Sequence, residues 1–298
     1  MIDYTGLDHR LRERGLTRSR LTALLGISSR TIAKIGRGEK LSRRVTDKLC
    51  LFFACAPEEL CRSISDNPIL QTLRDEKEAK ISGGLYHELQ VRLTYNSNHI
   101  EGSRLTEQQT RMIFETRTVD GTGISVGDIA DTSNHFRAVD RVIDRAEDTL
   151  SEELIKELHF ILKNGAPGSD RFPPGEYKAL PNLVGGRKTA GPAEVPGRMA
   201  ALLEAYNHRD TVTIEDVIAF HADLECIHPF QDGNGRVGRL IALKECLRWG
   251  IVPFIIEDAK KSYYYRGLAK WPDEKGWLLD TCLDGQDTFK RLLALFEN

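Results

Sequence analysis

The spacing of apolar residues predicts helices along most of this chain. From residue 213 to residue 250, apolar side chains recur every three or four positions, which is the period of a helix with one buried face. These positions are Val217, Phe220, Leu224 and Ile227, followed by Val237, Leu240, Ile241 and Leu247. Thr213 begins a capping-box pattern, Pro229 ends the first helix and Gly250 ends the second. The same period over 129–146, 152–162 and 199–206 predicts a mostly α-helical fold.

The segment 177–190 departs from the helical pattern. Gly185 and Gly186 lie near its centre, and apolar or basic residues flank them. Two glycines between short extended runs are typical of a β-hairpin turn. The alternative interpretation is an ordinary surface loop.

The first 66 residues have a pattern of their own. Residues 16–34 read as two short helices joined at Gly26, with Thr17 and Ser28 in N-cap positions. Four apolar residues are predicted to form the buried corner between these helices: Leu21, Leu24, Ile27 and Ile32. This pattern resembles the helix-turn-helix of Cro/repressor-type domains. The resemblance implies that Arg30, Thr31 and Lys34 are exposed on a helix that can enter the DNA major groove.

Charge distribution supports a separate N-terminal domain. Residues 1–64 hold 13 Lys/Arg and 7 Asp/Glu, whereas the remainder holds 29 and 37, a contrast hidden in the overall net charge of −2. A basic lobe suits the phosphate backbone of DNA. The alternative is a small helical bundle that docks a protein partner or mediates dimerisation. With 298 residues and 40% hydrophobic content, the chain is long enough for two cores.

The stretch 228–239 concentrates the chemistry of the chain. His228 titrates near neutrality and can act as a base, and Asp232 is a carboxylate of the kind that binds Mg²⁺. The Gly233-Asn234-Gly235 turn leads into a helix N-terminus, where backbone N–H groups can hold phosphate oxygens. Arg236 and Arg239 share one helix face and suit a polyphosphate. Each feature alone is compatible with an ordinary turn, cap or solvated surface, but together they favour a nucleotide site.

This stretch resembles the signature of the Fic family, His-Pro-Phe-x-Asp/Glu-Gly-Asn-Gly-Arg-x-x-Arg, at all nine specified positions. The resemblance implies that His228 is the general base for a target hydroxyl and that Asp232 holds Mg²⁺. It implies that the amides of Gly233, Asn234 and Gly235 hold the α and β phosphates. Arg236 would neutralise the leaving diphosphate, and Arg239 would bind the γ phosphate.

A second segment lies upstream, at Ser97 to Gly102. Ser97 and Glu101 are one helical turn apart, and Gly102 is a natural helix terminator. The run from Tyr95 to Thr106 resembles the inhibitory helix of Fic proteins. The resemblance implies that Glu101 pairs with Arg239, occupies the anchor for the γ phosphate and inhibits the protein from its N-terminal side.

The resemblance extends to two looser regions. In Fic proteins a hairpin flap aligns the target by strand addition, which implies target contacts for Leu183, Val184 and Arg187. Residues 263–265 resemble a late helix that packs aromatics near the adenine, which implies nucleotide contacts for Tyr264 and Tyr265. Three successive tyrosines are equally compatible with a core or an interface.

The sequence therefore predicts a mostly α-helical protein with a small helix-turn-helix bundle and an all-helical Fic core bearing a β-hairpin flap. We assign residues 1–66 to the helix-turn-helix domain, 67–120 to a linker and inhibitory helical segment, and 121–298 to the Fic catalytic domain. The expected reaction transfers AMP from ATP, with Mg²⁺, to a Tyr, Ser or Thr hydroxyl of a target protein or of the chain itself.

Three alternatives remain open. The same site can remove AMP, with Glu101 positioning a water. It can use another nucleotide. The chain can also be a DNA-binding regulator whose Fic part only senses nucleotide.

Further expectations concern the cell compartment and assembly. No apolar run approaches the ~20 residues of a membrane span. The six cysteines show no CxxC spacing, which favours reduced thiols in a cytoplasmic protein and makes a zinc site improbable. Both predicted domains are compatible with a homodimer, because paired DNA half-sites imply two-fold symmetry.

Overall fold

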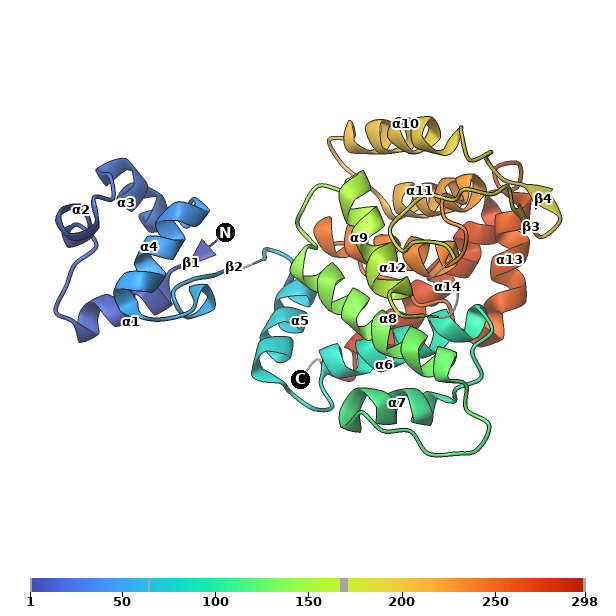
Figure 1. Ribbon diagram of the computed structural model, residues 1–298, viewed down its shortest axis with the longest axis horizontal. Helices are drawn as coiled ribbons and strands as arrows, with labels where there is room; N and C mark the ends of the chain where they lie inside the picture. The colour runs from blue at the N-terminus through green and yellow to red at the C-terminus, as the bar shows by residue number, and fades with distance from the viewer. Residues whose placement is uncertain (1, 64, 167–170, 297–298) are drawn as a thin grey trace. The chain divides into compact units, whose positions relative to one another are not determined.

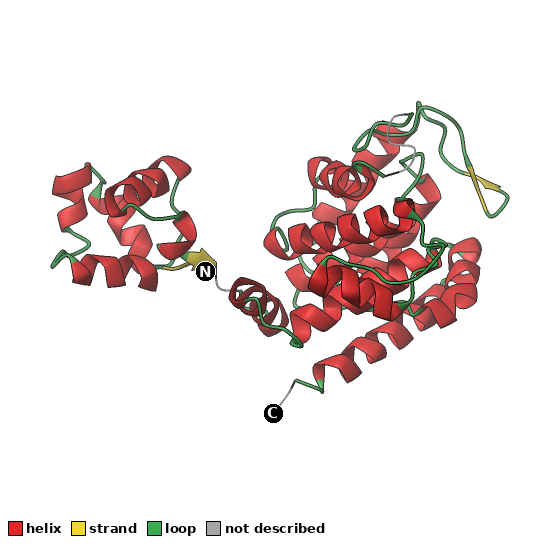
Figure 2. Cartoon of the chain, turned by 60° about the horizontal axis from the view of Figure 1, so that its bottom comes forward, coloured by secondary structure: helices red, strands yellow, loops and turns green. Residues whose placement is uncertain are grey.

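The computed structural model describes residues 2–63, 65–166 and 171–296. The chain forms two compact units, Met1–Gln71 and Thr72–Asn298. Fourteen α-helices, with two pairs of very short strands, make up nearly all regular structure in the described residues (Figure 2). No described helix has the length and apolar content needed to cross a membrane.

The first unit is a small helical bundle. Its helices are α1 (Thr5–Glu13), α2 (Arg20–Leu25), α3 (Ser29–Gly36) and α4 (Arg43–Phe53), and β1 (Ile2–Asp3) pairs antiparallel with β2 (Arg62–Ser63). Leu7, Leu11, Leu21, Leu49 and Phe53 belong to its core. The β1–β2 pair joins the two ends of this unit and was not predicted from the sequence.

The predicted buried corner of the first unit needs two corrections. Leu24 is 50% exposed, because in the six-residue α2 the inward face carries Leu21 and Leu25, which are one turn apart. The expected N-cap at Thr17 is also wrong, since α2 begins at Arg20. Ser28 does cap α3, where its hydroxyl accepts a hydrogen bond from the N–H of Thr31 at 3.2 Å.

The second unit is built around one central helix. It comprises α6 (Leu85–Ile100), α7 (Glu107–Thr116), α8 (Val126–Asp144), α9 (Glu152–Lys163), α10 (Val195–Asn207), α11 (Ile214–Ile227), α12 (Asn234–Arg248), α13 (Lys261–Lys270) and α14 (Gly276–Leu293). The helix α5 (Pro68–Ala79) crosses the boundary between the units. In Figure 1, α12 lies in the middle of this unit, and it packs against α6, α8, α9 and α11.

The segment 67–120, assigned from the sequence to a linker and inhibitory helical segment, contains α5, α6 and α7. Apart from its first residues it belongs to the second unit, where α6 and α7 pack against each other and against α8. The predicted hairpin is present as β3 (Leu183–Val184) paired antiparallel with β4 (Arg187–Lys188). It projects from the edge of the unit (Figure 2). The predicted helices over 129–146 and 152–162 correspond to α8 and α9.

Close packing of α13 on α14 gives a test of this core. A Cβ atom at Gly267 would lie 2.7 Å from the Cα of Leu278, which is backbone and cannot move aside. We expect Gly267→Ala to lower the free energy of unfolding by about 1–3 kcal/mol, as overpacked cores do. Gly276→Ala is the matched control, because a Cβ there meets nothing within 4 Å. Thermal denaturation of both variants measures the difference, and equal midpoints would contradict the close contact.

Candidate active site

The site begins at the end of α11. Thr213 caps this helix and forms a capping box with Asp216, as the sequence predicts. His228 ends the helix in a left-handed conformation with φ 52° and ψ 63°. Non-glycine residues seldom adopt this conformation, and such strain concentrates at functional sites. The intrinsic φ/ψ preference of histidine therefore does not explain this conformation, and the surrounding structure must hold it.

The imidazole of His228 is mostly buried and neutral. Its side chain is 15% exposed, and its Nδ1 is buried and lies 3.7 Å from Oε2 of Glu225. Burial lowers the pKa of His228 to about 4, and the positive charge of Lys178 acts in the same direction. Because Nδ1 is buried, Nε2 is the nitrogen that can receive a proton from a substrate.

Glu225 is a second carboxyl group at this centre. Burial, together with the nearby charge of Glu101, raises the pKa of Glu225 to about 8. Its Oε1 is buried and has no hydrogen-bond partner among the residues that the structure describes. Glu225 is therefore mostly protonated at neutral pH, which keeps a second negative charge away from His228.

The loop after His228 is fixed by a buried aromatic ring and by hydrogen bonds within the loop. Phe230 is fully buried, and its ring stacks on His159 with centroids 3.9 Å apart. The side chain of Asn234 accepts a hydrogen bond from the N–H of Phe230 at 2.8 Å and donates one to its carbonyl at 2.9 Å. Gly233 takes a φ of 80° just before α12. The first turn of α12 thus has a fixed position, and its N–H groups have no partners within the helix.

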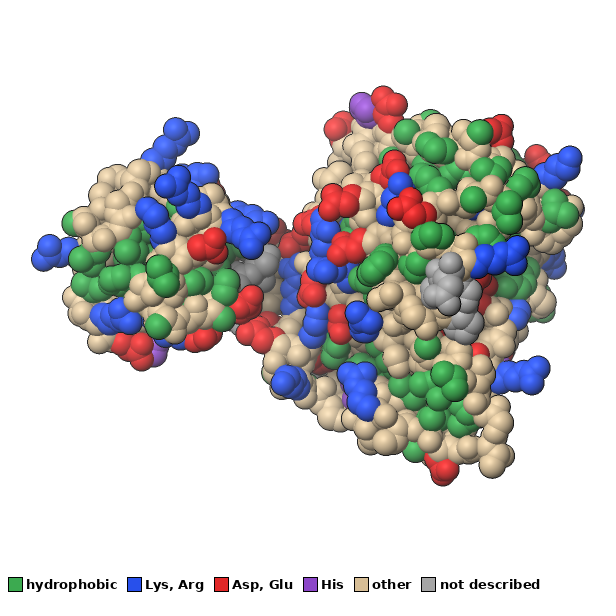
Figure 3. Space-filling model, viewed as in Figure 1, with side chains coloured by type: hydrophobic (Ala, Val, Ile, Leu, Met, Phe, Trp, Pro, Cys, Tyr) green, Lys and Arg blue, Asp and Glu red, His purple; other side chains and the backbone are tan. Residues whose placement is uncertain are grey.

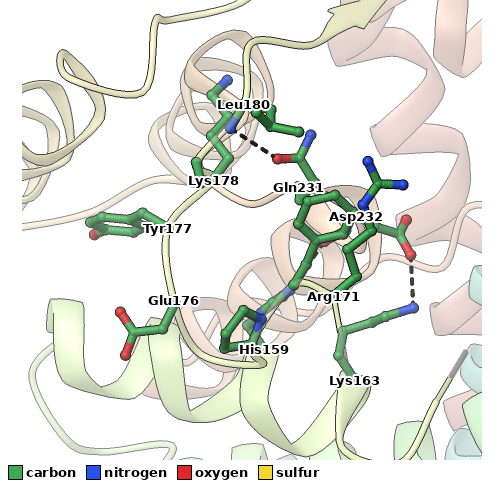
Figure 4. Close-up of a pocket in the computed structure, with 12 residues that line it drawn as sticks. His159, Lys163, Arg171, Glu176, Tyr177, Lys178, Leu180, Gln231 and Asp232 are labelled. Carbon is green, nitrogen blue, oxygen red and sulfur yellow. Dashed lines mark hydrogen bonds and ion pairs between the residues drawn. The ribbon is translucent and has the colours of Figure 1, made fainter. Parts of the chain in front are cut away.

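Asp232 lies beside this helix N-terminus and already has a cationic partner. Its Oδ2 is 2.7 Å from Nζ of Lys163, and its Oδ1 accepts a hydrogen bond from the N–H of Gly233 at 2.7 Å. Figure 4 shows Lys163 and Asp232 facing each other. Partial desolvation by the surrounding protein opposes ionisation of Asp232, but Lys163 outweighs it and holds the pKa of Asp232 below the ordinary value.

The two arginines of α12 are both buried but have different partners. Nη1 of Arg236 lies 2.7 Å from Oδ2 of Asp131 on α8, and Nη2 lies 3.8 Å from Asp232. Arg239 instead faces α6, where it donates to the hydroxyl and carbonyl of Ser97 at 3.0 and 2.9 Å. Its Nη2 also lies 2.7 Å from Oε1 of Glu101.

The contact between Glu101 and Arg239 is the one implied by the inhibitory-helix resemblance. Glu101 follows the last residue of α6, and Gly102 continues the turn with a φ of 101°. A Cβ atom at Gly235 would overlap Oε1 of Glu101, so the carboxylate lies directly against the first turn of α12. Glu101 therefore occupies the end of the helix where a phosphate oxygen would be stabilised.

The two predicted tyrosines of α13 have different surroundings. Tyr264 is fully buried, and its hydroxyl lies 2.7 Å from Nε2 of His221 and 3.4 Å from Nη1 of Arg239. This position differs from the expected nucleotide contact, because the ring lies in the core and supports Arg239. Tyr265 is 41% exposed and lines a cavity of about 560 Å³.

That cavity lies between the hairpin and the helices α11 and α13. Leu183, Val184 and Arg187 line one wall, and Glu225 and Cys226 line another. Leu183 is 65% exposed, and within the described part of the chain β3 pairs only with β4. The guanidinium of Arg187 donates to the carbonyl of Ala269 at 2.6 Å, so it fastens the hairpin to the end of α13.

The donor set around Asp232 fits a metal that nucleotide phosphates also ligate. In the described residues, no group of three or more His, Cys, Asp or Glu side chains converges on a metal position. Mg²⁺ readily binds through one carboxylate when nucleotide phosphates supply further oxygens. Asp232, beside the N-terminus of α12, fits such a complex rather than a free ion.

Comparison with known proteins identifies both parts of the chain. Residues 149–246 match the Fic/DOC family, and residues 6–66 match the Cro/C1-type HTH DNA-binding domain. This chain contains a Fic/DOC domain. The matched residues include α9, α11 and nearly all of α12, so the Fic domain supplies His228, Asp232 and both arginines.

Relatives of the Fic domain include proteins named protein adenylyltransferase Fic. The one from Drosophila grimshawi is 30% identical over 185 residues, and the one from Drosophila melanogaster is 32% identical over 181 residues. These alignments cover 58% of this chain but 36% of each relative, so the chain spans about a third of their length.

Solved structures share the fold. A Fic domain containing signaling protein from Bacteroides thetaiotaomicron matches with a TM-score of 0.63 and 26% identity, covering 76% of this chain and 94% of that one. Fic-1 from C. elegans matches with a TM-score of 0.61 and 20% identity, covering 93% and 80%. The second likeness shows the fold alone.

Four residues that contact the predicted site residues were not identified from the sequence. Lys163 and His159 on α9 contact Asp232, Asp131 on α8 pairs with Arg236, and Glu225 lies beside His228. The only available sequence signal was the spacing of His159 and Lys163, which places both on one helix face. Nothing in the sequence indicates what that face contacts.

The residues predicted to contact DNA lie on α3 of the HTH domain. Arg30 is exposed, while Thr31 and Lys34 are half-buried. Lys and Arg side chains gather on the part of the first unit where α3 lies (Figure 3). Nζ of Lys34 lies 3.9 Å from Oε2 of Glu39. This ion pair is long, so the ammonium group is able to contact a DNA phosphate instead.

Proposed function

We propose that this chain is a protein adenylyltransferase that transfers AMP from ATP to a Tyr, Ser or Thr hydroxyl of a target protein or of itself. The observation that carries the proposal is the neutral, mostly buried imidazole of His228 beside the N-terminus of α12. This arrangement puts a proton acceptor next to a group of backbone N–H donors. The names of the curated relatives support the same reaction.

His228 begins the reaction by accepting a proton. Its Nε2 takes the proton of the target hydroxyl, whose oxygen attacks the α phosphorus of ATP. The bond from that phosphorus to the bridging oxygen breaks, and pyrophosphate leaves. In-line transfer of this kind depends on positioning and on neutralised charge more than on covalent help.

The remaining residues bind and orient the nucleotide. The N–H groups of Gly233, Asn234 and Gly235 hold phosphate oxygens at the start of α12. Arg239 binds the terminal phosphate once Glu101 has left it. Asp232 would hold Mg²⁺, which would offset the phosphate charge.

The role of Arg236 follows from its ion pair with Asp131. Its guanidinium is 5% exposed and fixed by that pair at 2.7 Å. It therefore adds positive charge to the phosphate site from a fixed position. The flap and Tyr265 line the cavity that takes the nucleoside, and the exposed Leu183 and Val184 meet the target segment.

Two labelled forms of ATP distinguish this reaction from its rivals. The Glu101→Gly chain, incubated with Mg²⁺, should acquire label from ATP carrying it on the α phosphate and none from ATP carrying it on the γ phosphate. Incorporation of the γ label would indicate phosphoryl transfer instead. If neither label is incorporated and the parent chain, which keeps Glu101, removes AMP from adenylylated protein, the chain is a de-AMPylase.

The low pKa of His228 predicts an unusual pH dependence. A base with a pKa of about 4 stays unprotonated as the pH falls from 7 to 5, whereas an ordinary histidine would already be charged. We expect the transfer rate of the Glu101→Gly chain to stay level down to about pH 5. Removing Glu101 reinforces the effect, because its charge raises the pKa of His228. Initial rates with nucleotide affinity measured in parallel test this, and a decline centred between pH 6 and 7 would contradict it.

The HTH domain supports a second proposal, that the first unit binds DNA. Its match to a Cro/C1-type DNA-binding domain and the exposed Arg30 favour this role. Retention on DNA should weaken steeply with salt, since phosphate contacts release counterions. The double variant Arg30→Ala with Lys34→Ala should lose that retention and keep the transfer reaction. Retention that salt and these substitutions leave unchanged would count against it.

A further inference from the structure

Lys163 is a buried cation on the wall of a second cavity, of about 500 Å³, which also borders Asp232. The side chain of Lys163 is 9% exposed, while that of Asp232 is 67% exposed. Their charged groups are 2.7 Å apart, and Figure 4 shows the lysine reaching the carboxylate from α9. The pair thus joins a cation held by the core to a carboxylate that faces outward.

The stem of Lys163 follows the phosphate-binding turn. Its Cδ and Cγ are 3.4 and 3.7 Å from the position of a Cβ at Gly233, and Cδ2 of His159 is 3.6 Å from the same point. The ammonium group therefore lies at the edge of the turn that holds the phosphates. A cation there acts on Asp232 and on any bound phosphate at the same time.

Helix α9 holds Asp232 by its backbone as well. The N–H of Gly175 donates to Nδ1 of His159 at 2.8 Å, so the ring proton is on Nε2. That Nε2 donates to the carbonyl of Asp232 at 3.1 Å. Because Nδ1 accepts the hydrogen bond from Gly175, the ring carries one proton and is neutral. Of the two α9 contacts, Lys163 supplies the charge and His159 supplies only position.

A carboxylate next to phosphates needs a neighbouring cation. An unpaired Asp232 would repel the nucleotide, and a bound metal would remove this repulsion. Without metal, the nearest cation is Lys163, since Arg236 is 3.8 Å from the same oxygen and pairs closely with Asp131. A bound metal and the ammonium group of Lys163 would therefore both neutralise the negative charge of Asp232.

We propose that Lys163 is an internal counter-ion that substitutes for the metal at Asp232, so that nucleotide binds in the absence of divalent cation and depends little on it. The inference rests on the proposed nucleotide site and goes beyond it by assigning a residue that sets the metal dependence of binding. A metal at Asp232 would compete with Lys163 for the same carboxylate oxygen. Lys163 therefore reduces the increase in nucleotide affinity that the metal would give.

Calorimetric titration with α,β-methylene ATP, which the reaction cannot cleave, tests this in the Glu101→Gly chain. Titrations are run with excess EDTA and again with Mg²⁺, for the parent and for Lys163→Met, which keeps the stem against Gly233. In EDTA we expect Lys163→Met to weaken binding about tenfold or more, within the usual range of coupling between sites. With Mg²⁺ we expect unchanged or tighter binding. The ratio of the two affinities should therefore rise about tenfold or more.

Two further variants separate charge from packing. Lys163→Arg keeps the charge and should behave like the parent. Lys156→Met removes a lysine from the same helix that pairs with Glu152, and it should change neither titration. Circular dichroism confirms that each variant is folded before titration.

Equal weakening by Lys163→Met with and without Mg²⁺, or no change in either, would overturn the substitution of lysine for metal while leaving the nucleotide site intact. If the analogue binds neither with EDTA nor with Mg²⁺, even in the Glu101→Gly chain, the proposed function fails and this inference fails with it.

Discussion

Replacing Glu101 with glycine is expected to raise the rate of AMP transfer about 10- to 100-fold. The carboxylate of Glu101 lies 2.7 Å from Arg239, whose side chain is 4% exposed. A charge-assisted hydrogen bond in such a setting contributes about 1.5–3 kcal/mol, and every 1.4 kcal/mol corresponds to a factor of ten. Removing the carboxylate frees Arg239 for the terminal phosphate and clears the space in front of Gly235.

Initial rates of label incorporation from α-labelled ATP measure this activation. Glu101→Gln is the informative companion, because it keeps the shape of the side chain and loses its charge, so it should give a smaller gain. Glu107→Gly is the control at an exposed position on the next helix. A Glu101→Gly chain no faster than the parent would show that Glu101 does not inhibit.

Replacing His228 with alanine in the Glu101→Gly chain is expected to reduce the transfer rate about 10²- to 10⁴-fold, the usual contribution of a general base. The nucleotide affinity should change little, because phosphates are held by α12 and Arg239 rather than by the imidazole. The expected signature is therefore a fall in kcat with KM for ATP nearly unchanged.

The left-handed backbone at His228 requires a second variant. Alanine is strained at a φ of 52°, whereas asparagine tolerates this region. His228→Asn should therefore fold as the parent does and still lose transfer. His208→Ala, at an exposed position after α10, serves as the control. Undiminished label on His228→Asn would remove His228 from its role as base.

Much of the site could be predicted because its parts are neighbours in the sequence. The cap at Thr213, the helix end before Pro229 and the turn from Gly233 into α12 all depend on contacts within a few residues. Local steric preference decides these features, and the structure agrees with the sequence in each case. The hairpin around Gly185 and Gly186 belongs to the same class. Local sequence patterns were sufficient to predict these features.

Expectations about which face of a helix is buried were less secure. Leu24 and Tyr264 illustrate this. Leu24 is 50% exposed, although its spacing suggests a core position, and Tyr264 is buried, which is the core alternative that the run of three tyrosines left open. In a short helix, or a run of three tyrosines, several faces fit the same pattern. The neighbouring helices decide which one turns inward.

The sequence by itself determined the mostly helical fold, the helix end at His228 and the glycine turn into α12, because each follows from residues close together along the chain. Only the tertiary structure decided the partners of the charged groups: Lys163 for Asp232, Asp131 for Arg236 and Arg187 for the carbonyl of Ala269. Those partners are 69, 105 and 82 positions apart, and their contacts arise from the packing of whole elements. A buried charge such as Lys163 or Arg236 must find a counter-charge or a hydrogen-bond acceptor, but the sequence pattern does not say which helix or loop supplies it.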